Sequence, residues 1–297
     1  MSAFDEMRAQ VANKGGFIAA LDQSGGSTPK ALRLYGVEET SYDGDEAMFA
    51  EMHKMRARII LNEAFTSEQV IGAILFERTM NDKINGVSVP KLLWDTRGIV
   101  PFLKIDLGLE SEENGAQVMK PMPGLGERLA HAKSLGVFGT KERSVIHSAD
   151  AAGIKANVAQ HFEVAQAVLG AGMVPIIEPE VSINSPSKAA AEDILAAELL
   201  AHLDALSDGE DVMVKLTLPN KAGLYDAIAD HPRMLRVVAL SGGYSTQQAC
   251  ARLAENHKMV ASFSRALTEG LQKQQTDADF GAALSANINQ IYQASVA

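Results

Sequence analysis

The chain of 297 residues carries a formal net charge of -10, and hydrophobic residues make up 46% of it. This length suits one large domain or two small ones, and the apolar share is ample for a sizeable core. The acidic balance argues against a nucleic-acid partner, which needs a basic surface, but a local group of cations can still bind a small anionic substrate.

Several further classes are disfavoured by simple features of the sequence. Cys250 is the single cysteine, so no intrachain disulfide can form, which favours a reducing compartment. No signal-peptide run opens the chain and no stretch of about 18 apolar residues occurs, so we expect a cytoplasmic protein without a membrane partner. The histidines lack the spacing of a zinc helix, so we expect no metal or cofactor, although a carboxylate site for magnesium stays open.

The expected elements alternate along the chain. A helix over 1–13 comes first, and short apolar runs then recur at 17–21, 70–76, 99–105, 137–140, 173–177, 211–216, 235–240 and 259–263. Longer segments between these runs, such as 154–169, 189–206 and 246–257, have the apolar spacing of helices. This alternation predicts a single α/β domain over 1–297, a (β/α)8 TIM barrel with an extra N-terminal helix. A doubly wound open sheet is the alternative, but no Gly-x-Gly-x-x-Gly turn follows any run.

Charged and polar residues stand in or directly after most of these runs. A TIM barrel carries its active site at the carboxyl ends of its strands, so these side chains should meet at one mouth. Lys215 lies within the sixth run and Lys104 near the end of the third, and the others are expected to follow their strands: Asp22, Ser24, Ser27, Lys141, Arg143, Glu178, Glu180, Ser241, Gly242, Gly243 and Arg265. Because buried charge is costly unless it is paired, this recurrence predicts a functional site.

The cations among these residues point to a phosphorylated substrate. Ser241, Gly242, Gly243 and Arg265 follow the seventh and eighth runs, where barrels commonly bind phosphate. Lys215 is flanked by Val214 and Leu216 on a buried strand, and burial and neighbouring cations both lower the pKa of an amine. Such a lysine can attack a ketone and form a Schiff base, which permits carbon–carbon cleavage without a metal.

Blocks of sequence over nearly the whole chain resemble those of class I fructose-bisphosphate aldolases, and the pattern is closer to the shorter bacterial type. The matching blocks are Ala-Leu-Asp-Gln-Ser-Gly-Gly-Ser at 20–27, Gly-Ala-Ile-Leu-Phe-Glu at 72–77, Val-Pro-Phe-Leu-Lys-Ile-Asp at 100–106, Gly-Thr-Lys-Glu-Arg at 139–143, Val-Pro-Ile-Ile-Glu-Pro-Glu at 174–180, Lys215, Leu-Ser-Gly-Gly-Tyr-Ser at 240–245 and Phe-Ser-Arg-Ala-Leu at 263–267.

The resemblance implies a role for each matching residue. It makes Lys215 the Schiff-base nucleophile, Glu178 the acid/base that dehydrates the carbinolamine with Glu180 in support, Asp22 the base at the C4 hydroxyl, and Lys141 its neutralising partner. It also implies a C1-phosphate site and a site for the other phosphate. The first would use Ser241, Gly242 and Arg265, and the second Ser24, Ser27 and Lys104, with Arg143 nearby. The implied partner is a sugar bisphosphate, and a homo-oligomer is compatible with the family.

Departures and alternatives remain open at this point. Gln23 stands where animal-type members have glutamate, Leu107 replaces a basic residue, and Glu142 replaces an aromatic one. The sequence ends soon after Tyr292 without the tyrosine-ended tail that assists proton transfer in animal-type members, so the residue for that step is open. A Schiff-base lyase for a single phosphate, such as deoxyribose-phosphate aldolase or transaldolase, and a non-catalytic scaffold protein are the competing functions.

Overall fold

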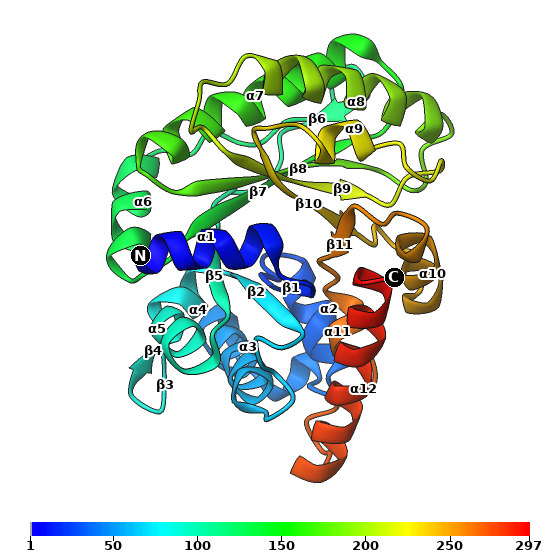
Figure 1. Ribbon diagram of the computed structural model, residues 1–297. Helices are drawn as coiled ribbons and strands as arrows, with labels where there is room; N and C mark the ends of the chain where they lie inside the picture. The colour runs from blue at the N-terminus through cyan, green and yellow to red at the C-terminus, as the bar shows by residue number, and fades with distance from the viewer. Residues whose placement is uncertain (1) are drawn as a thin grey trace.

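The computed structural model describes residues 2–297 and contains the expected parallel barrel (Figure 1). Hydrogen-bonded neighbours follow one another around it in chain order: β1 (Phe17–Leu21), β2 (Val70–Leu75), β5 (Val100–Lys104), β7 (Gly139–Ile146), β8 (Val174–Val181), β9 (Val212–Thr217), β10 (Met234–Leu240) and β11 (Met259–Ala261). β11 returns to contact β1, although no hydrogen-bond ladder joins these two strands in the described chain. The predicted (β/α)8 fold is confirmed.

Helices surround the strands on the outside, as Figure 1 shows. They are α2 (Ser27–Leu34), α3 (Gly44–Leu61), α4 (Glu77–Asn81), α5 (Val89–Lys91), α6 (Leu125–Ser134), α7 (Ala151–Gly170), α8 (Lys188–Asp204), α9 (Asp226–Ala229), α10 (Thr246–Ala254), α11 (Arg265–Thr268) and α12 (Asp277–Ser295). Shorter elements complete the chain: the 3-10 helix η1 (Glu39–Ser41), the π-helix η2 (Leu92–Thr96), the hairpin of β3 (Lys83–Ile84) and β4 (Val87–Ser88), and β6 (Ala116–Gln117), which pairs antiparallel with β7.

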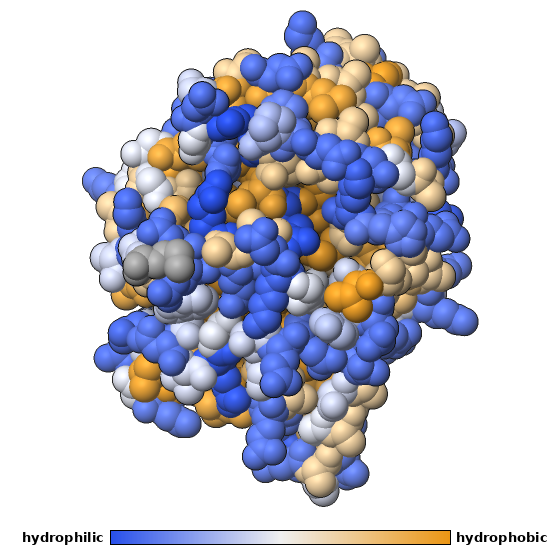
Figure 2. Space-filling model, viewed as in Figure 1, coloured by the Kyte–Doolittle hydropathy of each residue, from blue (hydrophilic) through white to orange (hydrophobic). Residues whose placement is uncertain are grey.

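The predicted extra helix is α1 (Ala3–Asn13), and it closes one end of the barrel. Its first turn is stabilised by a capping box between Ser2 and Asp5. Met7 and Val11 are buried in the same apolar cluster as residues of the barrel interior. In Figure 1 the helix lies across the middle of the ring of strands, and hydrophilic side chains dominate the face seen in this view (Figure 2). The apolar floor beneath α1 leaves the opposite end of the barrel for the site.

Two strand ends differ from the prediction. The fourth strand, β7, was expected over 137–140 but spans Gly139–Ile146, so Lys141 and Arg143 lie within it rather than after it. The fifth, β8, extends to Val181 and contains Glu178 and Glu180. Polar residues interrupt the apolar sequence of both strands, so the predicted strands ended too early. Their inward side chains line a polar cavity, and the outward ones on β7 are buried against α7.

Within the described chain, no helix combines the length and the apolar character needed to span a membrane.

Candidate active site

The inner face of the barrel changes from apolar to charged along each strand. Ile18, Phe102 and Met213 belong to the apolar floor, whereas Lys104 and Lys215, two residues beyond the latter two on their strands, line a polar cavity. Side chains of a strand alternate between its faces, so every second residue returns to the interior. The sequence therefore builds an apolar layer first and places the charged layer above it, at the carboxyl ends of the strands.

The cavity at this end has a volume of about 840 Å³ and brings the predicted residues together. Its walls include all of them except Gly243: Asp22, Ser24, Ser27, Lys104, Lys141, Arg143, Glu178, Glu180, Lys215, Ser241, Gly242 and Arg265. Gly243 lies next to this wall, because a β-carbon on it would be 3.8 Å from Nη2 of Arg265. The prediction that residues from separate strand ends converge on one mouth is therefore met in the structure.

A continuous chain of charges runs across the floor of the cavity. Nζ of Lys215 lies 3.1 Å from Oε1 of Glu178, and the other oxygen of Glu178 lies 2.8 Å from Nζ of Lys141. Lys141 also reaches Oδ2 of Asp22 at 2.7 Å. All four side chains are buried. Strands β9, β8 and β7 and the residue that follows β1 thus contribute alternating charges in the order lysine, glutamate, lysine, aspartate.

Neighbouring charges outweigh burial in setting the pKa values of Asp22, Glu178 and Lys141. Burial alone would raise the pKa of Asp22 and of Glu178, but Lys141 and Lys215 hold both carboxyl pKa values below their usual range. Burial alone would lower the pKa of Lys141, but Asp22 and Glu178 raise it. Asp22 and Glu178 are therefore ionised and Lys141 is protonated in the free protein at neutral pH.

Two more ion pairs lie at the edge of this chain. Arg143 donates through Nε to Glu180, and Nζ of Lys104 donates to a carboxylate oxygen of Asp106 at 2.7 Å. Both cations therefore have a carboxylate partner before any substrate arrives. Asp106, the last residue of the 100–106 block, orients Lys104.

A buried arginine that sequence reasoning missed supports the loop of Asp22. Arg56 on α3 is fully buried and donates through Nη2 to the carbonyl of Gln23 at 2.6 Å and through Nη1 to Thr79 at 2.7 Å. Burial lowers the pKa of Arg56 to about 10. Gln23 in turn donates to Oγ of Ser264 at 2.7 Å, which links the ends of β1 and β11. The signal in the sequence was a charge on the apolar side of α3, beside Met52, Ile59 and Ile60.

A glycine turn lies at one end of the cavity, next to a cation. Gly242 has φ +58°, and a β-carbon there would approach Ile183 to 2.8 Å, so glycine is required at this turn. Arg265 is exposed beside it. Such a turn with an adjacent guanidinium can bind a phosphate.

The other end of the cavity is formed by the start of α2. This helix begins at Ser27 without a side-chain cap, and Ser27 bonds to the carbonyl of Ser24 at 2.8 Å. Lys30, on the first turns of α2, also lines the cavity and was not predicted. A helix start with a lysine beside it favours an anion.

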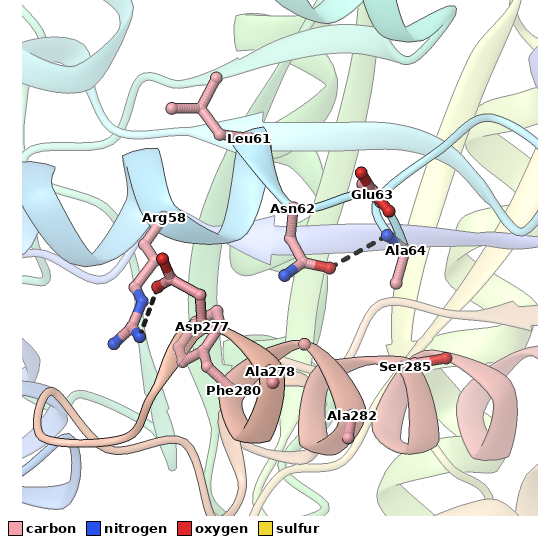
Figure 3. A pocket seen from close by; sticks show the side chains of 11 residues that line it. Arg58, Leu61, Asn62, Glu63, Ala64, Asp277, Ala278, Phe280, Ala282 and Ser285 are labelled. Atoms are coloured by element: carbon pink, nitrogen blue, oxygen red, sulfur yellow. Dashed lines mark hydrogen bonds and ion pairs between the residues drawn. The ribbon is translucent and has the colours of Figure 1, made fainter.

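The cavity has more cationic than acidic side chains, although the whole protein is acidic. The cations are Lys30, Lys104, Lys141, Arg143, Lys215 and Arg265, and the acids are Asp22, Asp106, Glu178 and Glu180. A second hollow of about 730 Å³ between α3 and α12 contains Arg58, paired with Asp277, and mostly small or apolar neighbours (Figure 3). It lacks a comparable chain of buried charges.

Among residues 2–297, no group of three or more His, Cys, Asp or Glu side chains is arranged to hold a metal ion.

Comparison with known proteins identifies relatives that share both sequence and length. The family model "Fructose-bisphosphate aldolase class-I" matches residues 4–220. A protein named fructose-bisphosphate aldolase class 1 from Porphyromonas gingivalis is 53% identical over 291 residues, which cover 98% of this chain and 99% of that protein. A protein of the same name from Synechocystis sp. is also 53% identical, over 98% of this chain and 97% of its own.

A solved structure supports the fold independently. Fructose-bisphosphate aldolase from Plasmodium falciparum, in a complex with TRAP and a small-molecule inhibitor, superimposes with a TM-score of 0.79. The alignment covers 99% of this chain and 95% of that chain at 21% identity. At this identity the similarity supports the barrel and not the individual side chains.

Proposed function

The chain belongs to the class I fructose-bisphosphate aldolase family, and we propose that its active site is the charged cavity at the barrel mouth, with Lys215 as the amine that forms the Schiff base. The reaction is the reversible aldol cleavage of fructose 1,6-bisphosphate to dihydroxyacetone phosphate and glyceraldehyde 3-phosphate. The observation that carries the site assignment is the buried charge chain from Lys215 through Glu178 and Lys141 to Asp22.

Glu178 accepts and then returns the proton that is transferred during Schiff-base formation. Lys215 must lose a proton before it attacks the C2 ketone, and Oε1 of Glu178 at 3.1 Å can accept it. Attack of the neutral amine gives a carbinolamine after a proton moves from nitrogen to the C2 oxygen. The protonated Glu178 then returns its proton to that hydroxyl, water leaves, and an iminium forms. The short separation thus allows Glu178 to act as an acid even though its carboxyl is ionised in the free protein.

Asp22 carries out the cleavage step. Its ionised carboxylate accepts the proton of the C4 hydroxyl as the C3–C4 bond breaks, and the electron pair of that bond moves into the iminium to give an enamine. The C4 fragment leaves as an aldehyde. Lys141, 2.7 Å from Asp22 and 2.8 Å from Glu178, keeps both carboxylates in place and offsets their mutual repulsion. Protonation of the enamine and hydrolysis of the iminium then release the second product.

The two ends of the cavity fit the two phosphates of the substrate. Ser241, Gly242 and Arg265 are assigned to the C1 phosphate, with Gly243 beside them. Ser24, Ser27 and Lys104 are assigned to the other phosphate, with Arg143 nearby, and Lys30 on α2 joins this group. Glu180, paired with Arg143, is assigned a supporting role beside Glu178. A cytoplasmic location, independence from metals and assembly into a homo-oligomer remain predictions.

Substitution of the nucleophile tests this assignment. We expect Lys215→Met to abolish cleavage of fructose 1,6-bisphosphate in the presence of EDTA, because methionine cannot form an imine. Lys221→Met is a matched control, since Lys221 is an exposed lysine shortly after the same strand. Residual activity of a correctly folded Lys215→Met variant, at a level near that of the control, would show that another group is the nucleophile.

A further inference from the structure

The outer face of β7 carries polar residues that the reaction does not use. Thr140, Glu142 and Ser144 alternate along this strand with Lys141 and Arg143, which face the cavity. All three outward side chains are completely buried. Glu142 is exceptional among them, because a fully buried carboxyl normally has a cation beside it.

A chain of close polar contacts connects this face to α7. Oγ of Ser144 lies 2.8 Å from Oδ1 of Asn157 and 2.7 Å from Nε2 of His161. Nδ1 of His161 lies 3.5 Å from Oε1 of Glu142. His161 is the one titratable group within ion-pair distance of Glu142 among the described residues, and it is fully buried as well.

The protons in this chain can be assigned from the donors available. The hydroxyl of Ser144 has one proton, and the carbonyl oxygen of Asn157 can only accept, so that proton points to Asn157. Ser144 then accepts from His161, whose Nε2 must carry a hydrogen. A neutral imidazole with its hydrogen on Nε2 has a bare Nδ1, which needs a donor. Glu142 can be that donor only if its carboxyl is protonated.

The electrostatic surroundings favour the same assignment. Burial, followed by the nearby charge of Asp106, raises the pKa of the Glu142 carboxyl well above its usual range. Burial lowers the pKa of His161 to about 3. These directions favour the uncharged form of both groups, and Oε1 of Glu142 and Nδ1 of His161 face each other at 3.5 Å without another hydrogen-bond partner in the described chain.

We propose that Glu142 is a positioning residue: a neutral carboxylic acid that donates to His161 and, through Ser144 and Asn157, fixes the outer face of β7 so that Lys141 and Arg143 are held correctly on its inner face. This inference rests on the proposed function of Lys141 and Arg143.

Lys141 needs this support because its ammonium group contacts two carboxylates at once. Its ammonium group must stay within 2.8 Å of Glu178, on the neighbouring strand β8, and within 2.7 Å of Asp22, which follows β1 across the barrel mouth. A small rotation of β7 would lengthen both contacts, and misplacement of a catalytic group by about 1 Å can cost on the order of 100-fold in rate. Contacts of Glu142 and Ser144, one residue away on each side of Arg143, oppose such a rotation.

Three variants test whether Glu142 acts as a neutral hydrogen-bond donor, as a charged group or only by filling space. Glu142→Gln keeps an N–H donor of the same length, whereas Glu142→Leu removes every donor. Thr140→Val is the matched control, because Thr140 lies on the same buried face but its hydroxyl is outside the contacts among Ser144, Asn157 and His161. We expect kcat for fructose 1,6-bisphosphate to stay within about threefold of the parent in Glu142→Gln and Thr140→Val. In Glu142→Leu we expect kcat to fall by about 10- to 100-fold with little change in KM.

The melting temperature distinguishes a positioning role from a purely structural one, because loss of a purely structural contact would lower it. Leucine removes an incompletely paired buried carboxyl, so Glu142→Leu should melt no lower than the parent while it is less active. Should Glu142→Leu fail to fold, Ser144→Ala cuts the same chain at the next link and should lower kcat in a folded protein. A double variant, Glu142→Leu with His161→Leu, should be no slower than Glu142→Leu alone, because both changes break one chain.

Defined outcomes would overturn the proposal. Equal losses of kcat in Glu142→Gln and Glu142→Leu would mean that a negative charge is needed, and full activity in both Glu142→Leu and Ser144→Ala would mean that the chain has no role. Borohydride trapping of dihydroxyacetone phosphate on the parent protein is measured in parallel. Failure to label Lys215 there would refute the proposed function, whereas labelling with fully active variants would refute only the role of Glu142.

Discussion

Nζ of Lys215 lies 3.1 Å from Oε1 of Glu178, from adjacent strands of the barrel. This contact joins the nucleophile to the nearest group that can accept its proton. Because Glu178 also contacts Lys141, its carboxylate is shared by two lysines, and it is ionised before substrate binds. The geometry therefore makes Glu178 the group through which the proton of Lys215 returns to the leaving water.

Glu178→Gln should slow Schiff-base formation more than any later step. The amide has nearly the same shape but cannot accept and return a proton, and general acid–base catalysis contributes about 100- to 10,000-fold. We expect kcat to fall within this range. Rapid-quench trapping with borohydride should show that the imine forms slowly with dihydroxyacetone phosphate. A normal rate of trapping in this variant would assign the proton transfer to another residue.

Asp22 should make stability depend on acid pH. Its pKa in the folded state is lowered, so the stabilisation is fully present above the unfolded value of about 4 and is lost as pH falls towards the folded value. We expect the free energy of unfolding in urea to decrease below about pH 5, and the slope to be shallower in Asp22→Asn. Asp45→Asn, at an exposed position at the start of α3, is the control. An unchanged slope in Asp22→Asn would contradict the buried ion pair with Lys141.

Two substrates should distinguish the proposed site for the C1 phosphate from the proposed site for the other phosphate. Lys30→Met is expected to lower kcat/KM for fructose 1,6-bisphosphate by about 10- to 100-fold, the value of a hydrogen bond to a charged group, and to leave fructose 1-phosphate unaffected. Arg265→Met should lower kcat/KM for both substrates, because both carry the C1 phosphate. If the parent protein cleaved the two substrates with equal efficiency, the assignment of a second phosphate site would be wrong.

Gln23 should matter for binding more than for chemistry. Its amide donates to Ser264 at 2.7 Å, across the seam where β1 and β11 lack a ladder, and Ser264 precedes Arg265. Gln23→Met removes this bond at similar size and should cost about 1 kcal/mol of stability. We expect KM to rise while kcat is largely kept. Gln247→Met, at an exposed position of α10, is the control, and a loss confined to kcat would place Gln23 in the catalytic step instead.

The barrel could be predicted from sequence because its strands are buried on both sides and are therefore continuous apolar runs. The active-site residues could be predicted because each stands at or near the end of such a run, as Lys215 and Asp22 do. The end of β7 was placed too early because Glu142 and Ser144 look like loop residues. Their burial depends on His161 and Asn157 of α7, which only the folded structure brings to this strand.

Residues that reach the site from helices were harder to predict. Lys30 lines the cavity from α2 and Arg56 contacts the Asp22 loop from α3, and neither belongs to a strand. Arg56 left a detectable signal, since it shares the apolar side of its helix with Met52 and Ile59. Which loop it would contact depends on how α3 packs, and periodicity alone does not contain that information.

Borohydride trapping tests whether Lys215 is the covalent nucleophile. The protein is incubated with dihydroxyacetone phosphate in the presence of EDTA, reduced with borohydride, digested and examined by mass spectrometry. We expect one reduced adduct on Lys215 together with EDTA-resistant cleavage of fructose 1,6-bisphosphate. An adduct on Lys141 alone, or no adduct from a protein that is active only with added metal, would contradict it.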